Sequence, residues 1–268
     1  MKNKKKKQMI LKVSRILTQI LFFLFFPYLF SQAYAGAKEI FLALGAGKVI
    51  DFSSIFVSRL VILCGLTFFA GRIFCGWACS FGAIGDWIYQ LAQWIQKKTK
   101  KKWVQIPAKA IPHLQKLKYL VLLATLSLCF FKRSDLVTSY SPWTFYSMLI
   151  QGKADFATYL YSAILLLVIL VGMALKERFF CQFLCPLGAI FSFIPNLPII
   201  SLRRNKSQCI KGCKACQMQC PVQVKLGEDS LRDGECISCG KCTLTCPRSN
   251  IKPSFLSLKS KKEDQVKA

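Results

Sequence analysis

RIFCGWACSFGAI (residues 72–84) and RFFCQFLCPLGAI (residues 178–190) are two copies of one pattern, R-x-F-C-x3-C-x2-G-A-I. Such self-similarity indicates a duplicated unit, and each copy follows an apolar stretch of the chain. In a helix, the spacing C-x3-C places both sulfur atoms on one face. We therefore expect the four cysteines of the two copies to meet; they are Cys75, Cys79, Cys181 and Cys185.

Three roles are open for these four cysteines. They could ligate a metal centre, act as redox thiols, or fill space as small apolar residues at a helix end, as free cysteines often do. The shared flanks of the two copies favour the first two roles, and the spacing does not separate them. Cys64 and Cys129 lie alone within apolar runs, so we interpret both as packing residues.

The composition excludes several classes of protein. The 268 residues are 53% hydrophobic, with 38 Lys and Arg against 12 Asp and Glu, a net charge of +26 and a mean hydropathy of +0.38. This apolar content excludes a disordered chain. Lysine blocks between apolar runs are typical of a membrane protein rather than of a nucleic-acid-binding one. The chain has one histidine and no C-x-x-C-H motif, which argues against haem.

Four apolar stretches predict an all-α membrane domain. The first (16–37) and the fourth (156–175) are long enough to cross the hydrocarbon core, which takes about 20 helical residues. The second (52–71) contains Arg59, and the third (119–131) is short, with basic flanks that can extend to the headgroups. We expect about four transmembrane helices, arranged as two parallel-repeat hairpins whose axis lies along the membrane normal.

The positive charges predict the orientation. Seven Lys and Arg precede the first stretch, two follow it, nine separate the second from the third, and three precede the fourth. By the positive-inside rule, both termini and the middle loop lie in the cytoplasm, and the protein is a multi-pass protein of the inner membrane. A rival interpretation is a cleavable signal peptide, because a basic start and an apolar run lead to Ala33-Tyr34-Ala35. Cleavage would leave the orientation of the remaining chain unchanged.

The strongest pattern lies near the C-terminus, where eight cysteines form two runs that each end in Cys-Pro. Residues 236–247, CISCGKCTLTCP, have the spacing of bacterial [4Fe–4S] ferredoxins, and residues 209–221, CIKGCKACQMQCP, have that spacing with one residue added. In two-cluster ferredoxins, the fourth cysteine of a run ligates the other cluster. The expected ligand sets are Cys209, Cys213, Cys216 and Cys246 for cluster 1, and Cys236, Cys239, Cys242 and Cys220 for cluster 2.

Structural zinc and disulfides are the alternatives for these eight cysteines. Zinc sites of this size use two C-x-x-C knuckles, and the predicted cytoplasmic location disfavours disulfides. We divide the chain into a transmembrane domain at 1–200, a small α+β two-cluster ferredoxin domain at 201–250, and a basic tail at 251–268. The ferredoxin domain is short and poor in large apolar side chains, so we expect it to need its clusters in order to fold.

With C-G-W-x-C and C-x3-C-P after apolar stretches and a two-cluster tail, the chain resembles the NapH type of ferredoxin-type membrane protein and the membrane half of NosR. The resemblance covers nearly the whole chain. It implies a subunit of a respiratory reductase system that oxidises quinol and passes electrons through iron–sulfur centres to redox partners. One residue departs from the family pattern, because the first copy has Ser80 where the second keeps Pro186.

The leading functional hypothesis is a membrane-bound conduit for electrons between the quinol pool and redox partners. No motif identifies a quinone site, and the polar candidates at the predicted membrane edge are Arg59, Arg72, Asp86, Glu177 and Arg178. The alternative is an accessory or regulatory protein that supplies reducing equivalents for metalloenzyme maturation. A transporter is disfavoured because the stretches lack broken, charge-lined segments. The chain has no phosphate-binding loop or nucleophile elbow, so quinol dehydrogenase activity would belong to a complex rather than to a free-standing enzyme.

Overall fold

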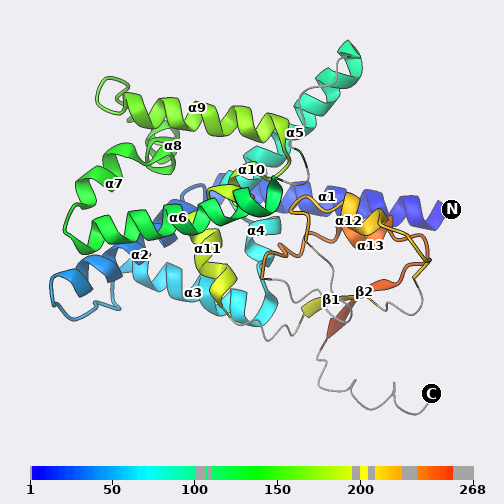
Figure 1. The fold of residues 1–268 in the computed structure, drawn as a ribbon, viewed down its shortest axis with the longest axis horizontal. Coiled ribbons are helices and arrows are strands. Elements are labelled where there is room, and N and C mark those ends of the chain that lie inside the picture. Colours follow the sequence, from blue (N-terminus) through cyan, green and yellow to red (C-terminus); the bar gives the residue numbers. More distant parts are fainter. Residues whose placement is uncertain are drawn as a thin grey trace.

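The computed structural model of the chain describes residues 2–100, 107, 110–194, 200–204, 209–224 and 234–255. The first half contains α1 (Lys2–Phe25), α2 (Leu29–Gly45), α3 (Ile55–Ala70), α4 (Ile73–Trp77) and α5 (Ser80–Thr99). The second half contains α6 (Ile111–Phe130), α7 (Ser134–Tyr140), α8 (Pro142–Ile150), α9 (Leu160–Leu175), α10 (Phe179–Phe183) and α11 (Pro186–Phe193). Figure 1 shows α1, α6 and α9 running roughly along the longest axis of the molecule.

The duplication in the sequence is also a duplication of structure. In each copy an apolar helix (α3 or α9) is followed by a five-residue helix (α4 or α10) and then by a helix that begins directly after the second cysteine (α5 or α11). Gly71, with φ of +64°, separates α3 from α4, and this left-handed conformation is one that glycine adopts without steric cost.

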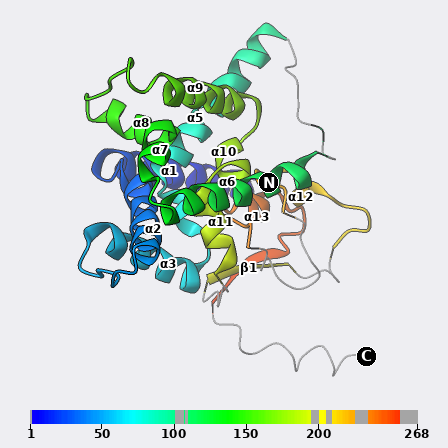
Figure 2. The same cartoon turned by 60° about the vertical axis from the view of Figure 1, so that its left-hand side comes forward.

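Tight helix packing forms the core of the body. Helix α2 lies along α3, and α5 lies along α9 (Figure 2). At Gly36 the backbone of α2 comes so close to the carbonyl of Phe56 that a Cβ would overlap it, so only glycine permits this approach. Aromatic rings fill the centre, where Phe81 contacts Phe180 with ring centroids 4.4 Å apart.

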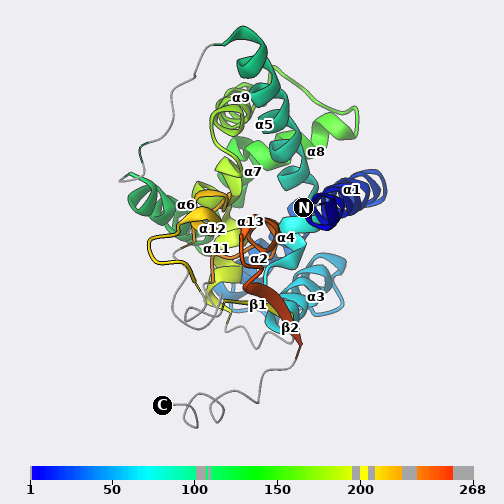
Figure 3. The same cartoon turned by 90° about the vertical axis from the view of Figure 1, so that its right-hand side faces the viewer.

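The C-terminal cysteine loops pack at one end of the helical body, near the start of α1 and between α1 and α6 (Figure 3). They carry the short helices α12 (Ala215–Met218) and α13 (Lys241–Thr245). Strand β1 (Ile200–Arg204) pairs antiparallel with β2 (Ile251–Phe255), with Ile200 opposite Phe255 and Arg204 opposite Ile251. Val222 and Ile237 belong to the same buried cluster as the helices, so the two regions share one core.

The expected four transmembrane helices are wrong. Among the described residues, only one helical stretch, Lys6–Phe25 of α1, is long and apolar enough to cross a membrane. The first apolar run is divided at Pro27, because proline cannot continue a helix, and its second half becomes α2. The second and fourth runs form helices of 16 residues, α3 and α9, which fall short of the roughly 20 that a span requires.

The expected α+β ferredoxin domain is also wrong. The described part of 209–250 contains two helices of four and five residues, joined by loops, and no sheet on which helices could pack. Among the described residues, strand pairing is limited to the ribbon of β1 and β2, which lie just outside the two ends of this segment. In this segment the cysteines and prolines follow one another closely. The stretches between them are too short for long helices or for the strands of a sheet. The basic tail lies outside the described residues from position 256 onward.

Candidate functional site

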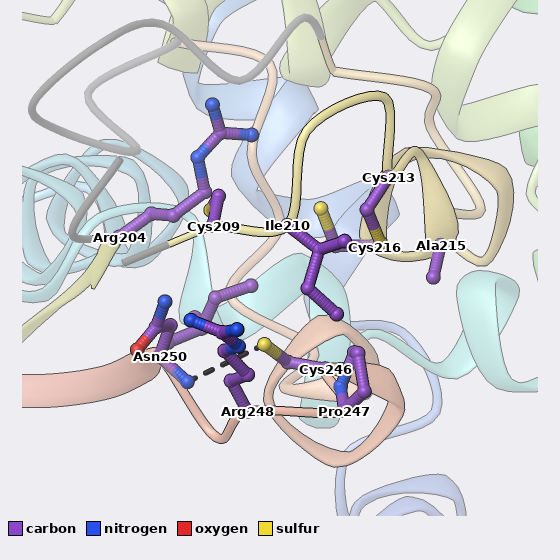
Figure 4. A pocket seen from close by; sticks show the side chains of 11 residues that line it. Arg204, Cys209, Ile210, Cys213, Ala215, Cys216, Cys246, Pro247, Arg248 and Asn250 are labelled. Carbon is purple, nitrogen blue, oxygen red and sulfur yellow. Dashed lines mark hydrogen bonds between the residues drawn. The ribbon is translucent and has the colours of Figure 1, made fainter. Parts of the chain in front are cut away.

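The cysteines of the first predicted set line one cavity in the C-terminal loops. These residues are Cys209, Cys213, Cys216 and Cys246. Figure 4 shows their side chains around the same space, with the backbone N–H of Asn250 donating to Sγ of Cys246 at 3.3 Å. Arg204 and Arg248 line the cavity as well, so its charge suits an anionic group.

The cysteines of the second predicted set line a neighbouring cavity. They are Cys220, Cys236, Cys239 and Cys242, and Cys216 also reaches this cavity. Its remaining walls are mainly apolar, with Val222 and Ile237 among them. Burial, together with the nearby thiols, raises the pKa of Cys242 to about 12. Metal centres bind thiolates, so binding at this site would be coupled to the loss of thiol protons.

Zinc and [4Fe–4S] clusters place different demands on the spacing of these cysteines. In the described part of the chain, no three His, Cys, Asp or Glu side chains stand close enough to share one metal ion. A zinc ion draws its sulfur ligands together around a single atom. A [4Fe–4S] cluster is larger and takes four cysteines at its corners, so its ligands stand further apart.

The two cysteine pairs of the repeated pattern are buried inside the helical body. Cys75 and Cys181 lie within α4 and α10, whereas Cys79 and Cys185 directly precede α5 and α11. Each is 6–7% exposed. A pair does not share one helix, because the short helix ends between its two cysteines. The second cysteine of each pair therefore caps the next helix, where backbone N–H groups are unpaired.

In the second copy, the cap is a hydrogen bond to the cysteine sulfur. The backbone N–H of Gly188 donates to Sγ of Cys185 at 3.1 Å. Cys79, the equivalent residue of the first copy, makes no such cap hydrogen bond with its side chain, although the nearby backbone of Gly82 acts to lower its pKa. Burial raises the pKa of Cys79 and that of Cys185, and the other thiols of the group raise both further. Electrostatic interactions join Cys185 to all three other cysteines, so the four thiols form one group.

Two arginines reach across from one copy to the other. Arg72 of the first copy lies on Gly188 of the second, where a Cβ would stand 2.8 Å from Nη2. Arg178 of the second copy lies on Gly82 of the first, where a Cβ would overlap Nη1. Both arginines are 1% exposed. The glycine of each copy thus makes room for the arginine of the other copy.

Each of these two arginines also interacts electrostatically with one cysteine from each copy. The pairs are Arg72 with Cys75 and Cys185, and Arg178 with Cys79 and Cys181. The same exchange of interactions therefore occurs in both directions between the copies. A nearby positive charge favours the thiolate form over the thiol.

Asp86 of α5 anchors one of the two arginines. Nε of Arg178 donates to Oδ1 of Asp86 at 2.8 Å and Nη2 donates to Oδ2 at 2.5 Å. Arg15 and Gln19 of α1 donate to the same carboxylate at 2.6 and 2.7 Å. Burial disfavours the charged form of Asp86, but the two arginines outweigh it and hold its pKa below the usual value. This network ties α1 to both copies.

Glu235, directly before Cys236, anchors the other arginine. Its carboxylate pairs with Nη1 of Arg72 at 3.2 Å and with Nζ of the fully buried Lys118. The hydroxyl of Tyr119 donates to Oε1 at 3.0 Å. Burial opposes ionisation of Glu235, and Arg72 and Lys118 lower its pKa in spite of that burial. The network places the second cysteine run directly against the helical body.

Both copies of the pattern also touch the loops of the second cavity. Gly76 packs so tightly on the carbonyl of Ile237 that a Cβ would overlap it. Trp77 donates from Nε1 to the carbonyl of Ser238 at 3.1 Å. In the second copy, Nε2 of Gln182 donates to the carbonyl of Val222 at 2.9 Å. The cavity of the second cysteine set therefore lies next to the paired motifs.

A cleft of about 780 Å³ opens between α1, α5 and α13. This volume is within the range of small-molecule sites, roughly 300–1,000 Å³. Its polar lining includes Gln19, Asp86, Tyr89 and Gln90, and Cys239 of the second cysteine set forms part of its wall. The cleft joins a helix long enough to cross a membrane to a predicted cluster ligand.

The polar residues selected from the sequence separate in the structure. Asp86 and Glu177 line the cleft, and Glu177 pairs with Lys241. Arg72 and Arg178 lie on the buried cysteines instead, and Arg59 lies on α3, away from the cleft lining. The partners missed from the sequence are Gly82, Gly188, Arg15, Lys118 and Glu235. The repeated G-A-I could have indicated the glycines.

Comparison with known proteins matches a family described as "4Fe-4S binding domain" to residues 55–102 and 159–204, the segments that hold the two copies of the pattern. The protein MJ0750 of Methanocaldococcus jannaschii is 31% identical over 91% of this chain and 96% of its own length. The protein NirI of Paracoccus denitrificans is 28% identical over 72% of this chain, which spans 28% of NirI. No solved structure matches the chain.

The resemblance inferred from the cysteine motifs is confirmed. The ferredoxin-type protein NapH of Escherichia coli is 22% identical over 72% of this chain and 66% of its own length. The regulatory protein NosR of Pseudomonas aeruginosa also matches, over 73% of this chain. The family description confirms the expectation of 4Fe–4S binding. The chain belongs to the family of ferredoxin-type 4Fe–4S proteins that includes NapH and NosR.

Proposed function

We propose that this protein is a membrane-bound iron–sulfur protein that passes electrons between quinol and redox partners of a respiratory system. The observation that carries the proposal is the cleft between α1 and the loop of Cys239. Quinol dissolves in the lipid, so its binding site must open near a membrane-embedded element and reach a redox centre. This cleft supports the proposal because it lies between α1, the one described helix long and apolar enough to cross a membrane, and Cys239, a proposed cluster ligand.

Two [4Fe–4S] clusters are proposed in the C-terminal loops, one in each of the two cavities. The ligands are Cys209, Cys213, Cys216 and Cys246 for the first, and Cys236, Cys239, Cys242 and Cys220 for the second. When bound, such clusters accept and release single electrons. The chain's own part is to hold the thiols, to exclude water with Val222 and Ile237, and to supply positive charge from Arg204 and Arg248.

Membrane attachment is proposed through α1 and the apolar faces beside it. Large apolar side chains are exposed on α1, α3 and α9; they include Leu17, Leu24, Ile62, Phe69, Leu167 and Val171. Exposure of many large apolar side chains is unfavourable in water, whereas lipid accommodates them. We propose the cytoplasmic membrane of the cell as the location.

The orientation follows from the basic start of α1. Nε2 of Gln8 donates to the carbonyl of Leu244 at 3.1 Å, so this end of α1 lies beside α13. Lysines at the start of the chain favour the cytoplasmic side by the positive-inside rule. The cluster loops packed beside them are therefore proposed to be cytoplasmic.

The quinol head group is proposed to bind among Gln19, Tyr89 and Gln90, whose polar groups can hydrogen-bond its hydroxyls. Asp86 is not proposed as the proton acceptor. Arg15 and Arg178 already occupy its carboxylate and hold its pKa low, so it remains ionised and orients the arginines.

The test is anaerobic reduction of the purified, detergent-solubilised chain by a soluble quinol analogue, followed as bleaching of the iron–sulfur absorbance. Gln90→Trp should fill the cleft and slow the quinol-dependent bleaching, while bleaching by dithionite stays unchanged. Leu91→Trp is the matched control, because Leu91 is the next residue of α5, is 57% exposed and does not line the cleft.

Either of two results would contradict the proposal. Clusters that respond to dithionite but not to quinol in the unmodified chain would exclude quinol as the donor. Equal bleaching rates in Gln90→Trp and Leu91→Trp would exclude this cleft as the site.

A further inference from the structure

The two proposed clusters leave four buried cysteines without a role. Cys75, Cys79, Cys181 and Cys185 come equally from the two copies of the pattern, and all four are thiols not joined in disulfides. Each belongs to the central buried cluster of the protein. Their low exposure removes them from contact with a partner's thiol or disulfide, which a redox exchange would require.

Among the described residues, buried positive charge near these thiols exceeds negative charge. Four buried cations belong to the networks of Asp86 and Glu235, namely Arg15, Arg72, Lys118 and Arg178. Two carboxylates, Asp86 and Glu235, pair with them. Four positive charges against two negative ones leave two unmatched among these described partners. Buried charge is costly unless it is compensated, so the site suits an anion carrying about two negative charges.

Hydrogen-bond donors beside the thiols also lack acceptors. Among the described residues, Nε of Arg72 and the hydroxyl of Tyr146 are buried with no hydrogen-bond partner. Arg72 interacts electrostatically with Cys75 and Cys185, and Tyr146 interacts with Cys79. Buried hydrogen-bond donors nearly always have an acceptor in folded proteins. Two donors without one, beside a single group of thiols, point to a missing acceptor between them.

Neither packing nor a single metal ion accounts for these features. Small apolar residues would need neither the crossing arginines nor the backbone N–H of Gly188 on the sulfur of Cys185. A zinc ion requires sulfurs gathered around one point, and no described group of three such ligands is that close. An oxidised [4Fe–4S] cluster with four thiolates carries roughly two negative charges and offers sulfur acceptors on every face.

We propose that Cys75, Cys79, Cys181 and Cys185 ligate a third iron–sulfur cluster of the [4Fe–4S] kind, between the two copies. Arg72 and Arg178 act as positioning residues that neutralise the thiolates from opposite sides. The glycines Gly82 and Gly188 provide the space for these arginines. The family description supports this assignment, because its two matched segments contain these cysteines and not the C-terminal eight.

The third cluster goes beyond the proposed function and does not depend on the quinol cleft. It would lie next to the second cavity, because Gly76 and Trp77 of the first copy contact Ile237 and Ser238 of the loop that carries Cys239. The three centres would then follow one another from the helical body to the outer C-terminal loops.

The test is the iron and acid-labile sulfide content of the anaerobically purified full chain. Three [4Fe–4S] clusters give about 12 irons per chain, and the two C-terminal clusters alone give about 8. The double variant Cys75→Ser/Cys181→Ser should lose about four irons and keep the spectra of the other two clusters. The matched control is Cys64→Ser/Cys129→Ser, which changes two cysteines outside the group, one of them fully buried.

About 8 irons in the unmodified chain would overturn the proposal even if the variant failed to fold, and about 10 would overturn the [4Fe–4S] assignment. Full retention of about 12 irons in Cys75→Ser/Cys181→Ser would also overturn it. Failure of quinol to reduce the protein would not affect these counts, so the two proposals fail separately.

Discussion

The two copies of the repeated pattern are nearly alike around their cysteines and differ where they meet the rest of the chain. Both place one cysteine in a short helix and the next at the start of a longer one. Both receive the arginine of the other copy on a glycine, Gly82 or Gly188. The shared residues thus belong to the site between the copies.

The carboxylate partners show the clearest difference. Arg178 pairs with Asp86, which lies two residues beyond the G-A-I of the first copy. The equivalent residue of the second copy is Ser192, which cannot pair with an arginine, and Arg72 pairs instead with Glu235 of the C-terminal loops. Tyr119 bonds both Ser192 and Glu235, so the glutamate occupies the place of the missing aspartate.

This difference explains how a single C-terminal segment binds a helical body that is built from two similar copies. A single segment cannot contact both copies in the same way, so each copy needs its own residues for it. The first copy offers the bare backbone of Gly76, and the second offers the amide of Gln182. Completing the charge network with Glu235 also makes the buried site depend on the docked cysteine loops.

The largest effect is expected from Asp86→Asn. The substitution leaves Arg178 and Arg15 buried without their carboxylate, and breaking a buried pair in this way costs about 3–5 kcal/mol. The free energy of unfolding in detergent is the measurement. Asp155→Asn is the control, because Asp155 lies on the surface. Equal stability of the two variants would show that the Asp86 network carries no special weight.

Asp86 also predicts a pH dependence. Its pKa is lower in the folded chain than in the unfolded one, where it is about 3.9. The stabilisation is therefore fully present above the unfolded pKa and is lost as the pH falls through the folded one. Asp86→Asn should flatten the acid side of the stability profile. An unchanged profile in the variant would contradict this assignment.

Gly76→Ala should have the next largest effect. The new Cβ would overlap the backbone carbonyl of Ile237, and backbone cannot move aside as a side chain can. We expect a loss of about 3 kcal/mol, with faster hydrogen exchange in residues 234–246. Gly65→Ala in α3 is the control, because a Cβ there meets nothing within 4 Å. Unaltered exchange in Gly76→Ala would refute close docking of the loops on the first copy.

Glu235→Gln should cost less than Asp86→Asn, about 1.5–2 kcal/mol. Its side chain is 21% exposed, so water can partly compensate Arg72 and Lys118. The comparison of the copies predicts a rescue, because Ser192→Asp places a carboxylate at the position equivalent to Asp86. Thermal unfolding of the single and double variants measures this coupling. Purely additive effects would mean that Ser192 and Glu235 do not share a role.

The smallest effect is expected from Ser80→Pro, which removes the departure of the first copy from the family pattern. Ser80 and Pro186 are both the first residue of a helix, where proline is tolerated. The change removes the hydrogen bond from Oγ of Ser80 to the carbonyl of Phe26, so stability should fall by about 0.5 kcal/mol. Loss of iron from this variant would show that serine has a specific task.

Local patterns were predictable because they reflect the chain's own geometry. The spacing of Cys236, Cys239 and Cys242 limits which metal centre they can hold, and the structure places them on one cavity. The apolar runs predicted the presence of helices correctly. They did not predict how many of those helices are long enough to cross a membrane. The number of membrane-crossing helices depends on where a helix breaks, as at Pro27. It also depends on which helix faces are covered by other parts of the chain, and packing decides this.

By itself, the sequence determined that the chain is duplicated, that it is rich in helix, and that its C-terminal cysteines have ferredoxin spacing. Each of these depends on residues close together in the chain. Only the tertiary structure decided that Arg72 and Arg178 cross between the copies, and that Glu235 replaces a carboxylate missing at Ser192. Such pairs join residues more than 90 positions apart. Buried charges select their partners by proximity in the folded core, which no local pattern records.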